Sequence, residues 1–227
     1  MKNQTAPSPF GTIRETNPEN TGPDSPIWLL GDSPSANDQE KLLRPLDSRH
    51  PTRHTIWTPI LDVVQRHVFV ECGCRLDDSK LFILNAVSDS AHKKKENREK
   101  LDAEIAELAE LLNRHKPLLV LCFGQFAFEC ARRAQEEEKL PALKWTIQKL
   151  SQEFRERILK VQLGSVTLLP LLHAVVALKF SKCSTDFSGG GDNYFEYTGH
   201  EIAQVLIKNR TDSSLNMLWL RAKREGT

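Results

Sequence analysis

Polar side chains that can bind a ligand or transfer a proton follow three short apolar runs of this sequence. Residues 27–30 lead into Gly31, Asp32 and Ser33, residues 81–84 lead into Asn85, and residues 166–172 lead into His173. Each polar residue has a structural explanation of its own, because Asp can cap a helix, Asn can form a turn and a single His can be structural. Their repeated position after apolar runs nevertheless predicts a shared site.

The apolar pattern predicts the elements that must position these residues. Continuous apolar runs at 27–30, 81–84, 118–123 and 166–169 are typical of strands buried on both faces of a parallel sheet. Apolar residues at three- and four-residue steps predict helices near 56–68, 97–115, 126–135 and 196–208, with a further helix or an edge insertion at 144–160. The alternation predicts a three-layer α/β/α sandwich with a central four-stranded parallel sheet. The carboxyl ends of its strands share one edge, where the polar residues would meet.

Length and composition fit one globular domain. Of the 227 residues, 39% are hydrophobic and 27% are charged, and the formal net charge of +1 gives no global basic field. We expect a flexible arm at 1–24, a single domain at 25–209 and a C-terminal tail at 210–227. No apolar run reaches the roughly 18 residues that a membrane-spanning helix needs. The sequence therefore predicts a cytoplasmic protein that does not contact a membrane.

The five cysteines show no pattern of a disulfide scaffold or a metal centre. An odd number favours reduced thiols in a reducing compartment. Cys72 and Cys74 are too close in sequence for a usual zinc knuckle, and Cys122 and Cys130 lie in a predicted strand and a predicted helix. We expect no metal and no cofactor.

The polar motifs resemble those of the uracil-DNA glycosylase superfamily. In that superfamily a loop of Gly, an acidic residue and Pro, a strand ending in Asn and a strand ending in His line the base pocket, in the order of residues 31–34, 81–85 and 169–173 here. Residues 116–127 resemble a non-catalytic strand–helix block of the same superfamily. The resemblance covers about residues 26–208 and implies a uracil-DNA glycosylase-like α/β/α fold.

The resemblance also implies hydrolysis of the N-glycosidic bond of a flipped base in DNA, as in base excision repair, without a cofactor. Asp32 would match the acid that positions water, Asn85 the residue that reads the base, and His173 the residue that stabilises the leaving base. A carboxylate near the sugar and a hydrogen-bond donor at the base suit the charges that develop as this bond breaks.

Further residues complete the predicted DNA site. Gly31 and Ser33 would line the base pocket, and Trp57 roughly matches an aromatic residue that stacks on the base, although a core anchor explains Trp57 equally well. Arg53, Lys179 and Lys182 lie in segments near the predicted edge and are candidates for phosphate contacts. The preferred base, the preference for single or double strands, and the oligomeric state stay open.

Two other functions fit the same residues. A non-catalytic binder of a nucleotide or nucleic acid would keep the fold and the pocket. The strand followed by Gly-Asp-Ser also resembles the first block of GDS-type lipases and esterases, in which the Ser is the acyl nucleophile. Ser33 would then need a base and an acid, and Asp89 and His92 have the Asp-x-x-His spacing for these roles.

Overall fold

A parallel sheet of four strands, in the order β3-β1-β4-β5, forms the centre of the molecule. The computed structural model describes residues 23–33, 57–138, 145–179, 187 and 193–220. The strands are β1 (Ile27–Gly31), β3 (Phe82–Asn85), β4 (Leu119–Phe123) and β5 (Thr167–Leu171). The predicted four-stranded parallel sheet is therefore confirmed.

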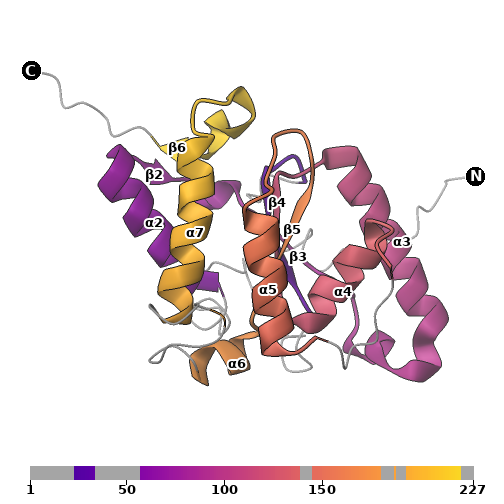
Figure 1. The fold of residues 1–227 in the computed structure, drawn as a ribbon. Helices are drawn as coiled ribbons and strands as arrows, with labels where there is room; N and C mark the ends of the chain where they lie inside the picture. The colour runs from indigo at the N-terminus through magenta and orange to yellow at the C-terminus, as the bar shows by residue number, and fades with distance from the viewer. Residues whose placement is uncertain (1–22, 34–56, 139–144, 180–186, 188–192, 221–227) are drawn as a thin grey trace, which may run out of the picture.

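Helices cover both sides of this sheet (Figure 1). They are α2 (Thr58–Cys72), α3 (Arg98–His115), α4 (Gln125–Ala134), α5 (Ile147–Ile158), α6 (Ala174–Lys179) and α7 (Tyr194–Lys208). α2 and α7 pack side by side on one side, α3 and α4 pack together on the other, and α5 lies along β5. Single-turn 3₁₀ helices occupy Asp78–Lys80, Ser90–Lys93 and Lys95–Asn97. The chain thus has an α/β fold with helices on both sides of the sheet.

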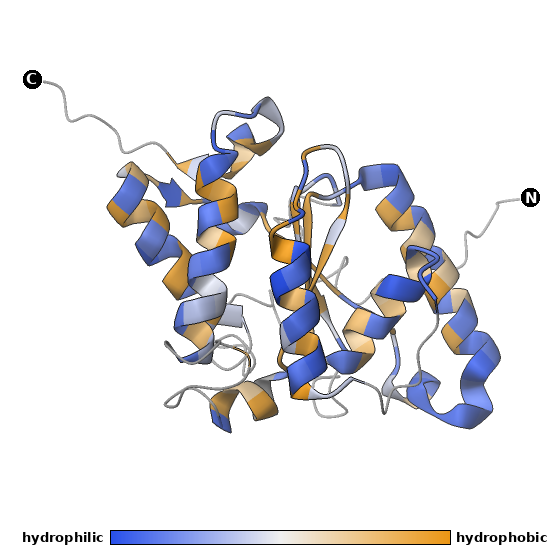
Figure 2. Ribbon diagram, viewed as in Figure 1, coloured by the Kyte–Doolittle hydropathy of each residue, from blue (hydrophilic) through white to orange (hydrophobic). Residues whose placement is uncertain are grey.

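The strands are almost entirely apolar because both of their faces are covered. Every residue of β1, β4 and β5 is buried. The inner strands are largely hydrophobic, while the helices carry hydrophilic residues along their outer faces (Figure 2). β3 departs from this pattern at its last residue, Asn85, which is half-buried. A partly exposed polar side chain therefore stands at the carboxyl end of β3.

Two of the helices end at a residue whose backbone is in the left-handed conformation. α2 has Pro59 in its first turn and stops at Gly73, whose φ of 62° is left-handed and whose N–H donates to the carbonyl of Phe69. α3 stops at Lys116, with a φ of 45°, directly before Pro117. The predicted helix stop at this Lys-Pro pair is confirmed.

Part of the predicted C-terminal tail is folded. A 3₁₀ helix at Ser213–Leu218 buries Leu215 and Leu218 completely. The short strand β6 (Trp219–Leu220) then pairs antiparallel with β2 (Arg75–Leu76) in a second, two-stranded sheet. The apolar side chains of this segment attach it to the domain, so the predicted boundary at 209 does not follow the packing. Residues 1–22 and 221–227 lie outside the described part of the chain.

A charged network joins α4 to α5. The Glu137 carboxylate accepts two hydrogen bonds from Arg157, at 2.9 and 2.7 Å, and one from Arg132 Nε, at 2.9 Å. Burial raises the pKa of Glu137, but the hydrogen bonds and charges of both arginines outweigh it and hold the pKa below its ordinary value. This carboxylate is therefore ionised and fully paired at neutral pH.

In the described residues, every helix is too short or too polar to cross a lipid bilayer.

Candidate functional site

The carboxyl ends of β1 and β3 bring Asn85 onto Gly31. The two residues are partners in the parallel ladder, and the N–H of Ala86 donates to the Gly31 carbonyl at 2.8 Å. A Cβ added at Gly31 would lie only 2.4 Å from Asn85 Oδ1. The side-chain amide of Asn85 therefore lies against the backbone of Gly31, and a side chain at position 31 would displace this amide.

Asp32 follows Gly31 and presents its two carboxylate oxygens to different surroundings. Oδ2 accepts a hydrogen bond from Lys93 Nζ at 2.7 Å. Oδ1 is buried and has no hydrogen-bond partner within the described part of the chain. A buried polar atom without a partner costs about 1–3 kcal/mol. Oδ1 is therefore the atom of this site most in need of a hydrogen-bond donor.

Lys93 is a site residue that the sequence does not single out. It stands in a run of three lysines, for which exposure to solvent is the simplest expectation. In the structure its ammonium group forms an ion pair with the carboxylate of Asp32 and lies 5.0 Å from the centre of the Phe126 ring. Lys93 is the last residue of the 3₁₀ helix Ser90–Lys93.

A buried carboxylate on α3 anchors the loop that carries Lys93. Glu104 is 3% exposed and accepts from the backbone N–H of Ser88 at 3.0 Å and from its hydroxyl at 2.6 Å. His92 Nδ1 lies 2.7 Å from the same carboxylate. The carboxylate of Asp89 instead accepts from the N–H of Ala91 at 2.8 Å. His92 is therefore paired with Glu104 and not with Asp89, the acid that the esterase alternative assigned to it.

Trp57 connects the end of β1 to the end of β4. Its Cη2 atom lies 3.4 Å from the Cβ position at Gly31, and its ring meets the Phe123 ring edge-on, with centroids 4.7 Å apart. Trp57 is 5% exposed, which agrees with a core anchor. Its Nε1 is nevertheless buried without a hydrogen-bond partner among the described residues. The indole ring is thus an apolar wall beside Gly31, and its N–H finds no acceptor in the described part of the chain.

His173 stands at the end of β5, beside β4. Gly124 follows β4 with φ 111° and ψ 160°, a conformation that only glycine adopts readily, and a Cβ there would lie 3.3 Å from His173 Cβ. The preceding N–H, of Leu172, donates to the Tyr194 hydroxyl at 2.8 Å. The carbonyl of His173 accepts the first hydrogen bonds of α6. The backbone on both sides of the half-buried His173 is therefore fixed by hydrogen bonds.

We use the name strand-end site for the residues at or beside the carboxyl ends of the parallel strands, which are Gly31, Asp32, Trp57, Asn85 and His173. Asn85, Gly31 and Trp57 lie in contact, and the sheet order places His173 two strands away from β1, next to Gly124. Ser33 is half-buried and follows Asp32 directly.

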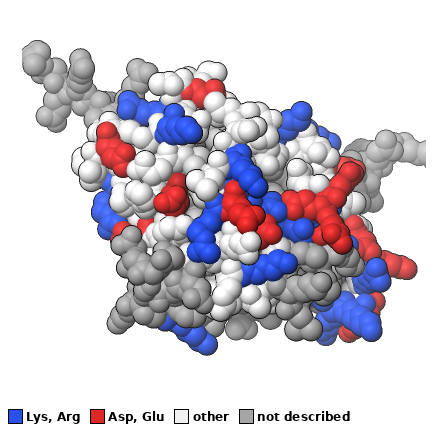
Figure 3. Space-filling model, viewed as in Figure 1, with Lys and Arg blue, Asp and Glu red and all other residues white. Residues whose placement is uncertain are grey.

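The predicted phosphate-binding residues are placed only in part. Lys179 ends α6 and is exposed, whereas Arg53 and Lys182 lie outside the described residues. On the face of the molecule drawn in Figure 3, basic and acidic side chains are mixed. A positive surface of single sign is therefore absent from the described residues of that face.

No family model and no curated protein matches this sequence. The function of the strand-end site therefore has to be argued from its own chemistry.

The cysteines near the strand-end site are not suited to nucleophilic chemistry. Burial raises the pKa of Cys130, on α4, to about 12, and the charge of Asp32 contributes in the same direction. Burial likewise raises the pKa of Cys122, on β4. A thiolate is the reactive form of cysteine, so these thiols stay protonated and inert at neutral pH.

Proposed function

We propose that this chain is a uracil-DNA glycosylase-like hydrolase that cleaves the N-glycosidic bond of a base flipped out of DNA. The observation that carries the proposal is a carboxylate oxygen of Asp32 that has no hydrogen-bond partner among the described residues, next along the chain to Gly31, whose backbone carries the Asn85 amide of the adjacent strand end. Such a site offers an acceptor for water and a hydrogen-bonding edge for a planar ring. Both are needed to recognise and release a base.

The proposed reaction gives a role to each of the four side chains of the strand-end site. Asn85 hydrogen-bonds the edge of the base, and the Trp57 ring borders the base pocket. Asp32 accepts a proton from water as the water oxygen bonds to C1′ of the sugar. The C1′–N bond breaks, its electron pair goes to the base, and His173 stabilises the departing negative charge by a hydrogen bond.

A second function, a non-catalytic binder of nucleotides or nucleic acid, is favoured by the pair between Asp32 and Lys93. The ammonium group occupies Oδ2 at 2.7 Å and neutralises the charge that hydrolysis would use. A carboxylate engaged in this way is a weaker acceptor for a water proton. The same pocket would then recognise a base without cleaving it.

An oligonucleotide assay separates the two functions. Single- and double-stranded oligonucleotides that contain one uracil are incubated with the chain, and abasic sites are detected by alkaline cleavage. Asp32→Asn is expected to reduce base release by about 10²–10⁴-fold, the usual contribution of a positioned acid or base. Asn85→Ala and His173→Ala should also reduce it.

Asp78→Asn is the matched control, because Asp78 is exposed and precedes β3, at the opposite end of the strand from Asn85. The glycosylase proposal fails if the wild-type chain releases no uracil, or if Asp32→Asn releases it at the wild-type rate. Oligonucleotide binding that weakens with salt and is not followed by base release would establish the binder.

A further inference from the structure

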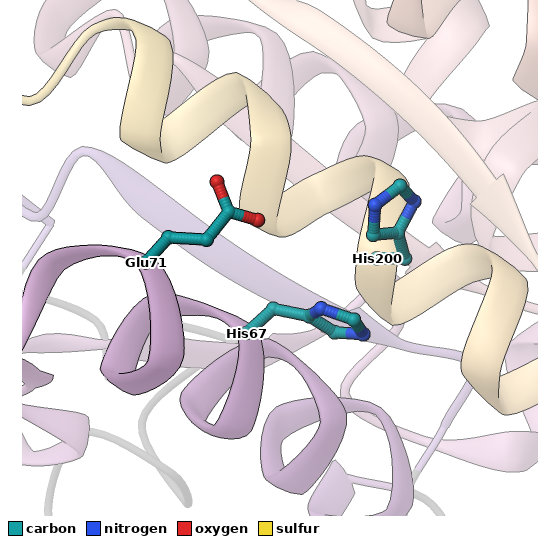
Figure 4. Close-up of side chains that lie close together, drawn as sticks. All are labelled: His67, Glu71 and His200. Atoms are coloured by element: carbon teal, nitrogen blue, oxygen red, sulfur yellow. The ribbon is translucent and has the colours of Figure 1, made fainter.

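Three side chains that commonly bind metal ions gather between α2 and α7, apart from the strand-end site. His67 and Glu71 project from α2 toward α7, which carries His200 (Figure 4). Each residue offers one ligand atom, and these atoms all lie within 4.8 Å of one another. The two imidazole rings meet edge-on with centroids 4.8 Å apart. Two imidazoles and a carboxylate form a donor set that zinc prefers.

The close approach of the two helices creates this cluster. Val63, His67 and Glu71 are four residues apart and therefore form one row along α2. A Cβ added at Gly199 would lie 2.5 Å from Val63 Cβ, so α7 can approach α2 this closely only with glycine there. His200 follows Gly199 directly. The row runs from the buried Val63 to the exposed Glu71, which leaves the cluster accessible from solvent.

Neighbouring polar groups orient the three side chains. Gln204 Nε2 donates to Glu71 Oε1 at 2.6 Å and lies 3.4 Å from His200 Nε2. Glu196 Oε2 lies 4.0 Å from His67 Nε2 and also pairs with Arg66. Glu196, His200 and Gln204 are again four residues apart and form the matching row on α7. The cluster thus has outer partners of the kind that hold metal ligands in place.

We propose that His67, Glu71 and His200 bind one zinc ion that joins α2 to α7. Zinc bonds of about 2.0–2.2 Å in a tetrahedron bring the ligand atoms to about 3.4 Å from one another. Small side-chain rotations achieve this from the observed separations, because His200 is 43% exposed and Glu71 is exposed. Water fills the fourth position. This site is independent of the proposed function.

Zinc titration of the full chain tests the proposal. The protein is first freed of metal with a chelator, and binding is then measured by calorimetry, with thermal melts before and after ZnCl₂ is added. We expect one zinc per chain, a higher Tm with zinc, and affinity at least about tenfold lower in His67→Ala and His200→Ala. Gln204→Ala should lower affinity by about tenfold, as the loss of an outer partner does.

His115→Ala is the matched control, because His115 ends α3 and pairs with Asp24, away from the cluster. It should keep wild-type zinc affinity. If His200→Ala does not melt cooperatively in the absence of zinc, the His200→Gln variant is tested in its place. The proposal is overturned if the wild-type chain binds no zinc, or if the variants at 67 and 200 bind zinc as tightly as the wild type.

Discussion

Replacing Gly31 with alanine tests whether the Asn85 amide lies over the backbone of β1. The new Cβ would stand 2.4 Å from Asn85 Oδ1, and because real Cβ contacts do not fall below 3.0 Å the amide oxygen must move by at least about 0.6 Å. This oxygen is the end of a short side chain, so the amide should rotate away from its preferred geometry at a cost of about 0.5–1.5 kcal/mol. In a domain of this size that lowers the Tm by roughly 1–6 °C.

A double-mutant cycle isolates this contact. In an Asn85→Ala background the added methyl meets no amide oxygen, so Gly31→Ala should cost less there than in the wild-type chain, by about 0.5 kcal/mol or more in urea unfolding. Gly164→Ala is the matched control: its added Cβ meets nothing within 4 Å, so its cost should not depend on Asn85. Additivity of Gly31→Ala and Asn85→Ala within about 0.3–0.5 kcal/mol would refute the assigned contact.

The same substitution should affect recognition more than folding. A displacement of about 1 Å at a reacting or recognising group can reduce a rate by about 100-fold. Because the Asn85 amide is displaced in Gly31→Ala, the rate of base release or the binding affinity of this variant should fall by about 10–100-fold, although the domain stays folded. Unchanged base release or binding in folded Gly31→Ala would mean that the amide has no part in recognition.

Three further substitutions test the supports of the fold and the site. Tyr194→Phe leaves the buried N–H of Leu172 without its acceptor and should lower the free energy of unfolding by about 1–3 kcal/mol, whereas Tyr197→Phe should change it by less than about 0.5 kcal/mol. Glu137→Gln should lower the free energy of unfolding at pH 7 by about 1–3 kcal/mol. Because the folded-state pKa of Glu137 is lowered, this difference from wild type should shrink as the pH falls below the ordinary value of 4.5. Urea unfolding at several pH values measures it. Gly124→Ala should cost about 1–3 kcal/mol, because φ is 111°, and a melt equal to wild type would contradict this conformation.

The strand ends could be predicted because each depends on a few neighbouring residues. A strand covered on both faces is continuously apolar, so the first polar residue after the run marks where the chain leaves the sheet. This rule located Asp32, Asn85 and His173 at the carboxyl ends of three parallel strands. It does not state which strands are adjacent, and the order β3-β1-β4-β5 is what places Asn85 on Gly31.

The rest depends on contacts between distant segments. Nothing local distinguishes Lys93 from the two lysines that follow it, and only the packing of its loop on Glu104 directs it to Asp32. The spacing of His67 and Glu71 is visible in the sequence as one helix face. Their partner His200 lies more than a hundred residues later, and its approach requires the packing of α7 on α2.

The pair between Asp32 and Lys93 need not prevent hydrolysis. The two side chains are 20% and 33% exposed, and ion pairs near the surface contribute only about 0–1 kcal/mol. If the chain acts on DNA as proposed, an arriving phosphate, which accepts hydrogen bonds from ammonium groups, would draw Lys93 away at small cost. The carboxylate would then have both oxygens available, one for water and one facing the positive sugar. Under the proposed function, the pair would keep the charge of the carboxylate balanced until DNA is bound, and binding of the DNA backbone would free the acid for chemistry.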